Sequence, residues 1–95
     1  KKVNEMSIPL MSIVSKAIHA GYAVSSNDGL KRTTNFETAY KALRLSMAAM
    51  DELTIRLWIG EKRVASLFLI FDGDDNILQS YTALPEAEAF VESLL

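Results

Sequence analysis

The sequence predicts an α+β fold, in which helices pack on an antiparallel sheet. Two apolar segments, residues 53–59 and 64–71, are rich in β-branched and aromatic residues, and the short Gly-led connection between them is typical of a β-hairpin. Three other segments carry apolar residues at helical spacing. The expected order is α-β-β-α-β-β-β-α, with a three-stranded meander and a short N-terminal hairpin forming the sheet.

A first helix is expected over residues 7–20, where apolar residues share one stripe and Gly21 can adopt the left-handed conformation that ends a helix. Residues 22–26 and 30–33 flank an Asn-Asp-Gly turn, so we expect a short edge hairpin there. The stripe of the helix consists of Leu10, Ile13, Val14, Ala17 and Ile18.

A second helix is expected to start near Asn35 and to stop near Asp51. Thr34 and Glu37 have the spacing of a capping box, which marks a helix N-terminus. The buried stripe of this helix is expected to contain Phe36, Ala39, Tyr40, Leu43, Met47 and Met50.

The central hairpin leads into a third strand and a last helix. A dense turn signal at residues 72–76 precedes an expected strand over residues 77–82, and Pro85 suits the first turn of the helix that follows. The stripe of that helix contains Leu84, Ala87, Phe90, Val91 and Leu94.

Length and composition predict a single domain over residues 1–95. A chain of 95 residues supplies one hydrophobic core but not a second, and 49% hydrophobic with 23% charged residues is typical of globular proteins. We expect residues 1–6 to be disordered or to derive from an expression tag.

Charge and cysteine content exclude several classes of function. A net charge of -2 gives no long-range attraction for phosphate backbones, so nucleic-acid binding would need a local basic patch. The sequence has no cysteine, which removes thiolate catalysis and cysteine-ligated metals and fits a reducing cytoplasm, the expected location. No stretch approaches the roughly 20 apolar residues that a membrane span needs.

Catalytic groups are sparse in this sequence. His19 is the only histidine, and its place near the end of the first helix favours an interaction with the helix dipole over acid–base chemistry. Asp72, Asp74 and Asp75 form the only oxygen-ligand cluster, and a solvated turn explains it better than a metal site. We therefore expect no enzyme activity, cofactor, metal or small-molecule ligand.

The strand at residues 64–71 is apolar on nearly every residue, so both of its faces should be covered. A hairpin connection of even length would leave a second face with Thr54, Arg56 and Trp58 beside Ala65, Leu67, Leu69 and Phe71. A connection of odd length would make that surface Trp58 with Phe68 and Ile70. Either a helix of the same chain or a partner, which is a second copy or a foreign protein, covers it.

Two sets of candidate binding residues follow. For a protein partner or a homodimer through the sheet, Trp58 and Arg56 are the expected contacts, because buried interface centres are rich in tryptophan and arginine. The surrounding apolar contact residues would be Leu67, Leu69 and Phe71. For nucleic acid, the alternative partner, the candidate phosphate contacts are Lys31, Arg32, Lys41 and Arg44.

The most distinctive segments of the chain are GYAVSSNDGLKRTTN, DELTIR, VASLFLIFDGDDNILQSYT and the acidic last helix. In these segments, which cover most of the chain from about Met11, the sequence resembles short bacteriophage and prophage proteins of unknown activity. The chain departs from that pattern after Gly29, where those proteins have a longer acidic and aromatic insertion before the Lys-Arg pair. The resemblance implies a bacterial cytoplasmic setting and an accessory role, and it carries over no functional residues.

The leading prediction is therefore a non-enzymatic protein–protein interaction module. It would be an accessory protein of a phage or other mobile element that binds a host or phage protein. The alternative prediction is a nucleic-acid-associated regulator that uses a local basic patch.

Overall fold

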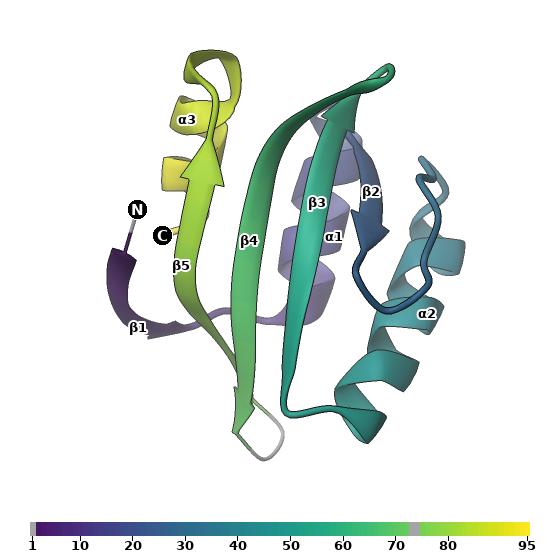
Figure 1. The fold of residues 1–95 in the computed structure, drawn as a ribbon, viewed down its shortest axis with the longest axis vertical. Helices are drawn as coiled ribbons and strands as arrows, with labels where there is room; N and C mark the ends of the chain where they lie inside the picture. Colours follow the sequence, from purple (N-terminus) through teal and green to yellow (C-terminus); the bar gives the residue numbers. More distant parts are fainter. Residues whose placement is uncertain (1, 73–74) are drawn as a thin grey trace.

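The computed structural model describes the backbone of residues 2–72 and 75–95 and the side chains of residues 8–71 and 78–95. These residues form an α+β domain with one five-stranded antiparallel sheet of order β1-β5-β4-β3-β2 (Figure 1). The strands are β1 (Lys2–Ser7), β2 (Ala23–Ser26), β3 (Glu52–Ile59), β4 (Lys62–Asp72) and β5 (Asp75–Ala83). The helices are α1 (Leu10–His19), α2 (Phe36–Ala49) and α3 (Pro85–Ser93).

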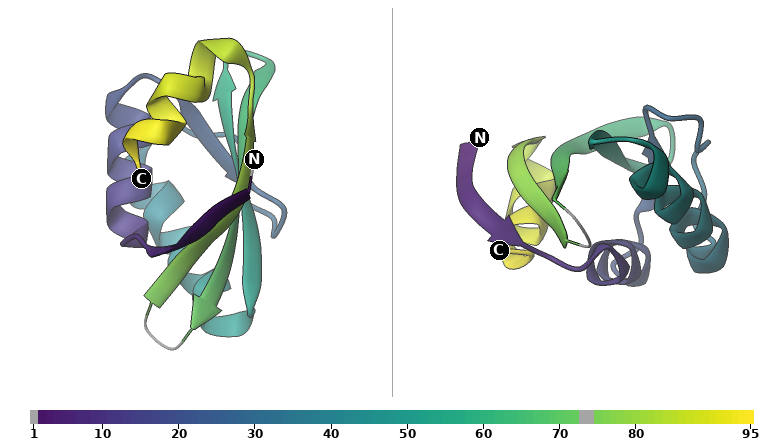
Figure 2. Two further views of the ribbon diagram at one scale, coloured as in Figure 1. Left: turned by 90° about the vertical axis from the view of Figure 1, so that its left-hand side faces the viewer. Right: turned by 90° about the horizontal axis from the view of Figure 1, so that it is seen from below.

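The three helices lie on the same side of the sheet (Figure 2). In the described part of the chain, α3 packs against β4 and β5, while α1 and α2 pack against each other at the β2 end. None of these three helices lies on the second face, so they do not provide the intramolecular cover that was one of the two alternatives.

The element order differs from the expected one at both edges of the sheet. Residues 1–6 were expected to be disordered or to derive from a tag, whereas Lys2–Ser7 forms β1 and pairs with β5. The expected strand at residues 30–33 is absent from the described structure, where only an isolated bridge joins Val24 to Thr33. Two backbone hydrogen bonds form that bridge: Val24 N–H donates to Thr33 O at 2.9 Å, and Thr33 N–H donates to Val24 O at 3.0 Å. A loop instead of a strand therefore covers the edge of β2.

The N-termini of α1 and α2 differ from the expected ones. Pro9 occupies the N-cap position of α1, so that helix starts later than residue 7. Asn35, not Thr34, caps α2, because its Oδ1 accepts a hydrogen bond from Thr38 N–H at 2.8 Å.

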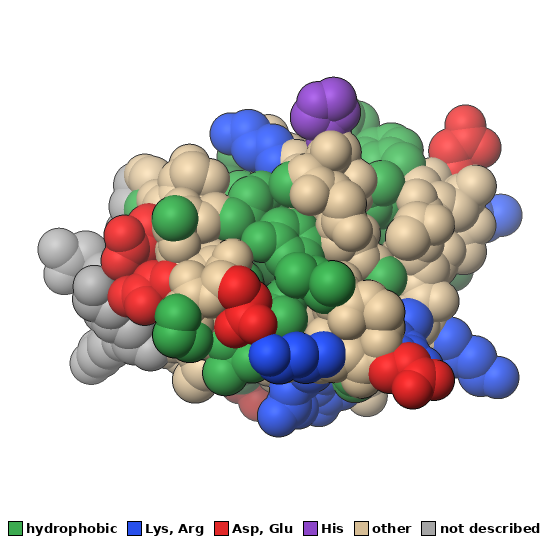
Figure 3. All heavy atoms as spheres, turned by 90° about the horizontal axis from the view of Figure 1, so that it is seen from above, with side chains coloured by type: hydrophobic (Ala, Val, Ile, Leu, Met, Phe, Trp, Pro, Cys, Tyr) green, Lys and Arg blue, Asp and Glu red, His purple; other side chains and the backbone are tan. Residues whose placement is uncertain are grey.

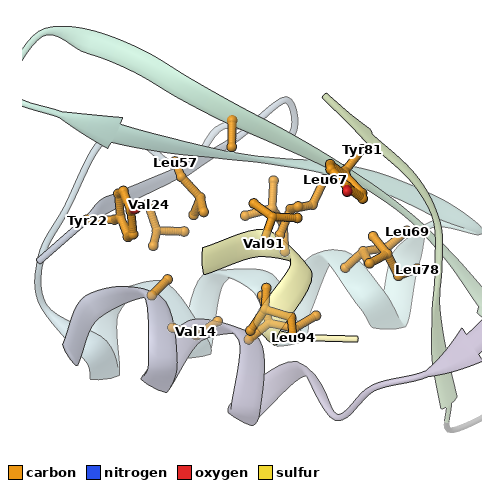
Figure 4. Packing of buried hydrophobic residues seen from close by; sticks show 14 of the residues in the cluster. Val14, Tyr22, Val24, Leu57, Leu67, Leu69, Leu78, Tyr81, Val91 and Leu94 are labelled. Atoms are coloured by element: carbon orange, nitrogen blue, oxygen red, sulfur yellow. The ribbon is translucent and has the colours of Figure 1, made fainter. Parts of the chain in front are cut away.

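The hydrophobic core fills the space between the sheet and the helices (Figure 4). The ring of Tyr22, the residue before β2, meets the Phe90 ring of α3 with centroids 4.9 Å apart, which links the β2 edge to the last helix. The largest fully buried side chains are Ile13, Val14, Val24, Leu43, Leu53, Ile55, Leu57, Val64, Leu67, Leu69, Leu78 and Val91.

A β-bulge decides which residues of β4 join this core. The connection is the two-residue turn Gly60–Glu61, since Ile59 pairs with Lys62, and its even length agrees with the first of the two expected parities. The register then shifts, because Trp58 pairs with Arg63 but Leu57 pairs with Ala65, which leaves Val64 as an extra residue. One extra residue exchanges the faces of everything beyond it, so the side-chain arrangement is the one expected for an odd connection.

Candidate binding face

The face of the sheet opposite the helices is called the open face here. Its polar and charged members are Ser25, Glu52, Thr54, Arg56, Arg63, Ser66, Ser80 and Thr82, and its apolar members are Ala23, Trp58, Phe68 and Ile70. Figure 1 looks onto this face, with the strands in front of α1. Trp58, Phe68 and Ile70 are each partly exposed.

Trp58 is fixed in place at one end of the open face. Its Nε1–H donates to Ser25 Oγ on the adjacent strand at 2.8 Å. Ser25 is only 6% exposed, so this hydrogen bond supplies a partner for a buried hydroxyl. The Arg32 guanidinium lies over the indole ring, 4.8 Å from its centroid, and its Nη1 donates to Gly60 O at 3.1 Å. The loop before α2 therefore reaches across β2 and holds one charged group against Trp58.

Two further arginines lie beside Trp58. Arg63 is its register partner on β4, and Arg56 lies two residues along β3 on the same face, between Ser25 and Ser66. Within the described residues, neither Arg56 nor Arg63 forms an ion pair. Figure 3, viewed onto this end of the sheet, shows Lys and Arg side chains gathered on the side of the open face.

The neighbouring Lys62 behaves differently. Its Nζ lies 2.7 Å from Glu86 Oε2 on α3, and the hydrogen bond from Lys62 lowers the pKa of the Glu86 carboxyl below its ordinary value. Consecutive residues after the turn thus place one cation in a pair on the helix side and the next, Arg63, on the open face.

A shallow hollow lies beside Arg63. It has a volume of about 150 Å³ and is lined by residues of β4 and of the end of β5, among them Ser66 and Thr82. Arg63 has guanidinium donors, and Ser66 and Thr82 have hydroxyl donors, which are groups that bind an anionic oxygen such as that of a carboxylate.

The other half of the open face carries two large apolar side chains, Phe68 and Ile70, with the acidic Glu52 as the register partner of Ile70. Phe68 lies between Thr54 on β3 and Ser80 on β5, and Ile70 follows it two residues along β4. Residues two apart on a strand are separated by about 6.8 Å. Along β4, the open face therefore changes from the charged Arg63 to the apolar Phe68 and Ile70 within a few residues.

The predicted protein-binding residues divide between the two faces. Trp58 and Arg56 lie on the open face as predicted. The prediction was wrong for Leu67 and Leu69, which are fully buried against the helices because the bulge reverses the parity of β4. Phe71 is partly buried and packs against the core.

The predicted nucleic-acid residues do not form one patch. Arg32 lies on Trp58, whereas Arg44 donates to Tyr40 Oη at 3.1 Å on α2, and this hydrogen bond raises the pKa of Arg44 above its ordinary value. Lys41 is exposed on α2, and Lys31 lines a separate groove of about 370 Å³ between the loop and that helix. Arg56 and Arg63 lie closer to Arg32 in the fold than the sequence suggests.

Other chemistry finds little support in the described structure. His19 is exposed at the end of α1. The side chains of residues 72–77, which include the acidic cluster, lie outside the described residues, and elsewhere no group of three His, Cys, Asp or Glu could hold a metal ion. None of the described helices is both long and apolar enough to cross a membrane.

No family model, no curated protein and no solved structure matches this chain.

Proposed function

We propose that this protein is a non-enzymatic protein-binding module and that the open face is its contact surface. The observation that carries the proposal is the placement of Trp58, Phe68 and Ile70 on a sheet face that no described helix covers. Antiparallel sheets with a solvated face usually alternate apolar and polar residues, whereas β4 is apolar on both faces along much of its length. Large apolar side chains on that second face are what a binding partner would cover.

The composition of the open face supports a protein partner. Tryptophan and arginine are the residue types most enriched at interface hot spots, and Trp58 and Arg56 are close neighbours on β3. The Ser25 and Arg32 contacts restrict the Trp58 ring before a partner arrives, so binding loses less side-chain entropy.

The partner is proposed to be a different protein and not a second copy. A symmetric dimer with its two-fold axis along the strands would bring two clusters of Arg32, Arg56 and Arg63 toward each other, and like charges across an interface oppose association. With the axis across the strands, each cluster would face the Phe68 and Ile70 half of the other copy, which pairs the arginines mainly with apolar side chains. Light scattering over a wide concentration range should therefore show a monomer. A dimer that dissociates in Phe68→Ser would contradict this choice of partner.

The resemblance to short bacteriophage and prophage proteins supports the setting of the proposal. It favours an accessory protein of a mobile element that acts in a bacterial cytoplasm on a host or phage protein. The cysteine-free composition fits that compartment.

One observation favours a nucleic-acid-associated regulator as a second candidate. Arg32, Arg56, Trp58 and Phe68 combine basic and aromatic side chains on one sheet face, which is the combination that single-stranded nucleic acids bind. This function requires affinity that falls steeply with added salt, and salt-insensitive binding would exclude it.

The experiment compares proteins captured from bacterial lysate by matched variants. Phe68→Ser and Ile70→Thr change the open face, while Leu45→Ser changes a leucine of α2 that is 65% exposed on the helix side. Circular dichroism establishes that each variant is folded. A captured protein is then purified and titrated against the chain, using the fluorescence of Trp58, the only tryptophan.

The proposal predicts a partner that binds wild type and Leu45→Ser equally and binds the open-face variants at least about tenfold more weakly, as for the loss of a hot spot. A partner lost in Leu45→Ser but kept in Phe68→Ser and Ile70→Thr would contradict it. So would the absence of any protein that distinguishes these variants.

A further inference from the structure

We infer that the partner presents an acidic segment to the open face, with its carboxylates on Arg56 and Arg63 and an apolar side chain on Phe68 and Ile70. This inference rests on the proposed function and adds the chemistry of the partner. The face combines a basic half and an apolar half, and an acidic segment with an apolar anchor complements both halves.

The charge distribution supports this choice of partner. Arg56 and Arg63 lack a carboxylate partner among the described side chains, although the chain as a whole has a net charge of -2. An arginine without an internal partner on the face of an acidic protein keeps its bidentate donor geometry for an external carboxylate. The neighbouring Lys62, which is paired with Glu86, shows that such pairs do form at this end of the sheet.

Arg32 completes the basic half. Its position is set by Trp58 and by one hydrogen bond to Gly60, and a guanidinium has five N–H donors, so donors remain for a further acceptor. Because the group is already held, binding a carboxylate there loses little side-chain entropy.

The hollow beside Arg63 is large enough to bind a carboxylate group. A volume of about 150 Å³ is several times the roughly 10–15 Å³ that one water needs by a comparable measure. Its Ser66 and Thr82 hydroxyls can donate to the second carboxylate oxygen while Arg63 binds the first.

A protein segment fits the open face better than a nucleic-acid strand does. One face of the Trp58 ring is already covered by Arg32, so that ring is less available for stacking on a base. Ile70 offers no ring at all. A phosphate backbone carries charge at every nucleotide, and beyond the arginines it would run toward Glu52, the register partner of Ile70.

The test measures fluorescence anisotropy with three labelled probes. They are a short peptide alternating glutamate with leucine, the same peptide with lysine in place of glutamate, and a short oligothymidylate. The proteins are wild type, Arg56→Met and Arg63→Met, with Arg44→Met as the matched control on α2. Because Arg56 and Arg63 are at least partly exposed, neither substitution opens a cavity in the core.

The inference predicts that wild type and Arg44→Met bind the glutamate peptide equally, and that Arg56→Met and Arg63→Met each bind it about tenfold more weakly. Binding of the lysine peptide should be weaker than that of the glutamate peptide. Amide chemical shifts recorded with the glutamate peptide should change along β3 and β4.

Three results would overturn the inference. The first is preference for the lysine peptide, and the second is binding of the glutamate peptide that is absent or unaffected by Arg56→Met and Arg63→Met. The third is tighter binding of oligothymidylate, lost in the same arginine variants. If the inference fails while a captured partner still depends on Phe68 and Ile70, the proposed function stands and only the acidic chemistry is wrong.

Discussion

Between Val64 and Phe71, strand β4 is apolar at every residue except Ser66, yet its two faces have different surroundings. Leu67 and Leu69 are fully buried against the helices, whereas Phe68 and Ile70, which alternate with them, are partly exposed on the open face. The side chains are similarly hydrophobic, so hydrophobicity alone does not assign them to the core. The comparison separates residues that the fold needs from residues that the fold leaves available for a partner.

The largest expected effect comes from the covered face. Leu67→Ala should lower the free energy of unfolding by roughly 2–5 kcal/mol, because it removes buried methyl groups and leaves a cavity between sheet and helices. Phe68→Ala on the open face should cost about 1 kcal/mol, because no enclosed cavity forms there. Urea denaturation of the two variants measures both values. Equal costs would mean that the open face is as important to the fold as the core is.

An intermediate effect is expected at Trp58. Trp58→Phe removes the Nε1–H that donates to Ser25 and should lower the free energy of unfolding by about 1 kcal/mol. Ser25→Ala removes the same hydrogen bond from the other side. In a double-mutant cycle, the free energy lost by the double variant should be smaller than the sum of the two single losses by about 0.5–1.5 kcal/mol. Strict additivity would show that this bond does not stabilise the open face.

The smallest effect compares the two cations after the turn. Lys62→Met should return the pKa of Glu86 upward to its ordinary range, because the hydrogen bond from Lys62 is the main cause of its lowering. Arg63→Met should leave that pKa unchanged, since Arg63 lies on the open face. Carboxyl NMR titration of Glu86 distinguishes the two.

The sign of the pH dependence follows from the lowered pKa. A carboxyl with a lower pKa in the folded state contributes stability above its unfolded pKa and loses that contribution as the pH falls through the folded pKa. Wild type should therefore lose slightly more stability than Lys62→Met on acidification through that window. The difference should be small, because both side chains are well exposed and solvent screens the pair.

Periodicity in the sequence was enough to predict the helices and the central hairpin. Apolar spacing placed all three helices, and the dense turn signals separated the strands of the meander. Local capping was predicted less well, because Thr34 and Asn35 are both good N-cap residues and only the backbone shows that Asn35 accepts from Thr38.

The edges of the sheet could not be predicted for a different reason. Strand β1 exists through its pairing with β5, which lies about seventy residues away in sequence, and such long-range pairing leaves little local signal. In the loop before α2, the bridge between Val24 and Thr33 completes the edge of β2 without a second strand.

The candidate site was half predictable. Trp58 and Arg56 were chosen because tryptophan and arginine are enriched at interface hot spots, and the structure places both on the open face. Leu67, Leu69 and Phe71 were misassigned, because the bulge at Val64 cannot be seen in a strand whose two faces are both apolar. The grouping of Arg32 with Trp58 depends on a loop path that no sequence pattern indicates.

The bulge at Val64 also bears on how the hairpin avoids a competing register. In most sheets, a slip by one residue is opposed because it would move polar side chains into the core. A slip of β4 would exchange Leu67 and Leu69 for Phe68 and Ile70, so burial of apolar area would oppose it only weakly. The pairing must instead be fixed by local geometry, namely the turn at Gly60, whose φ is 60°, and the single extra residue that follows it.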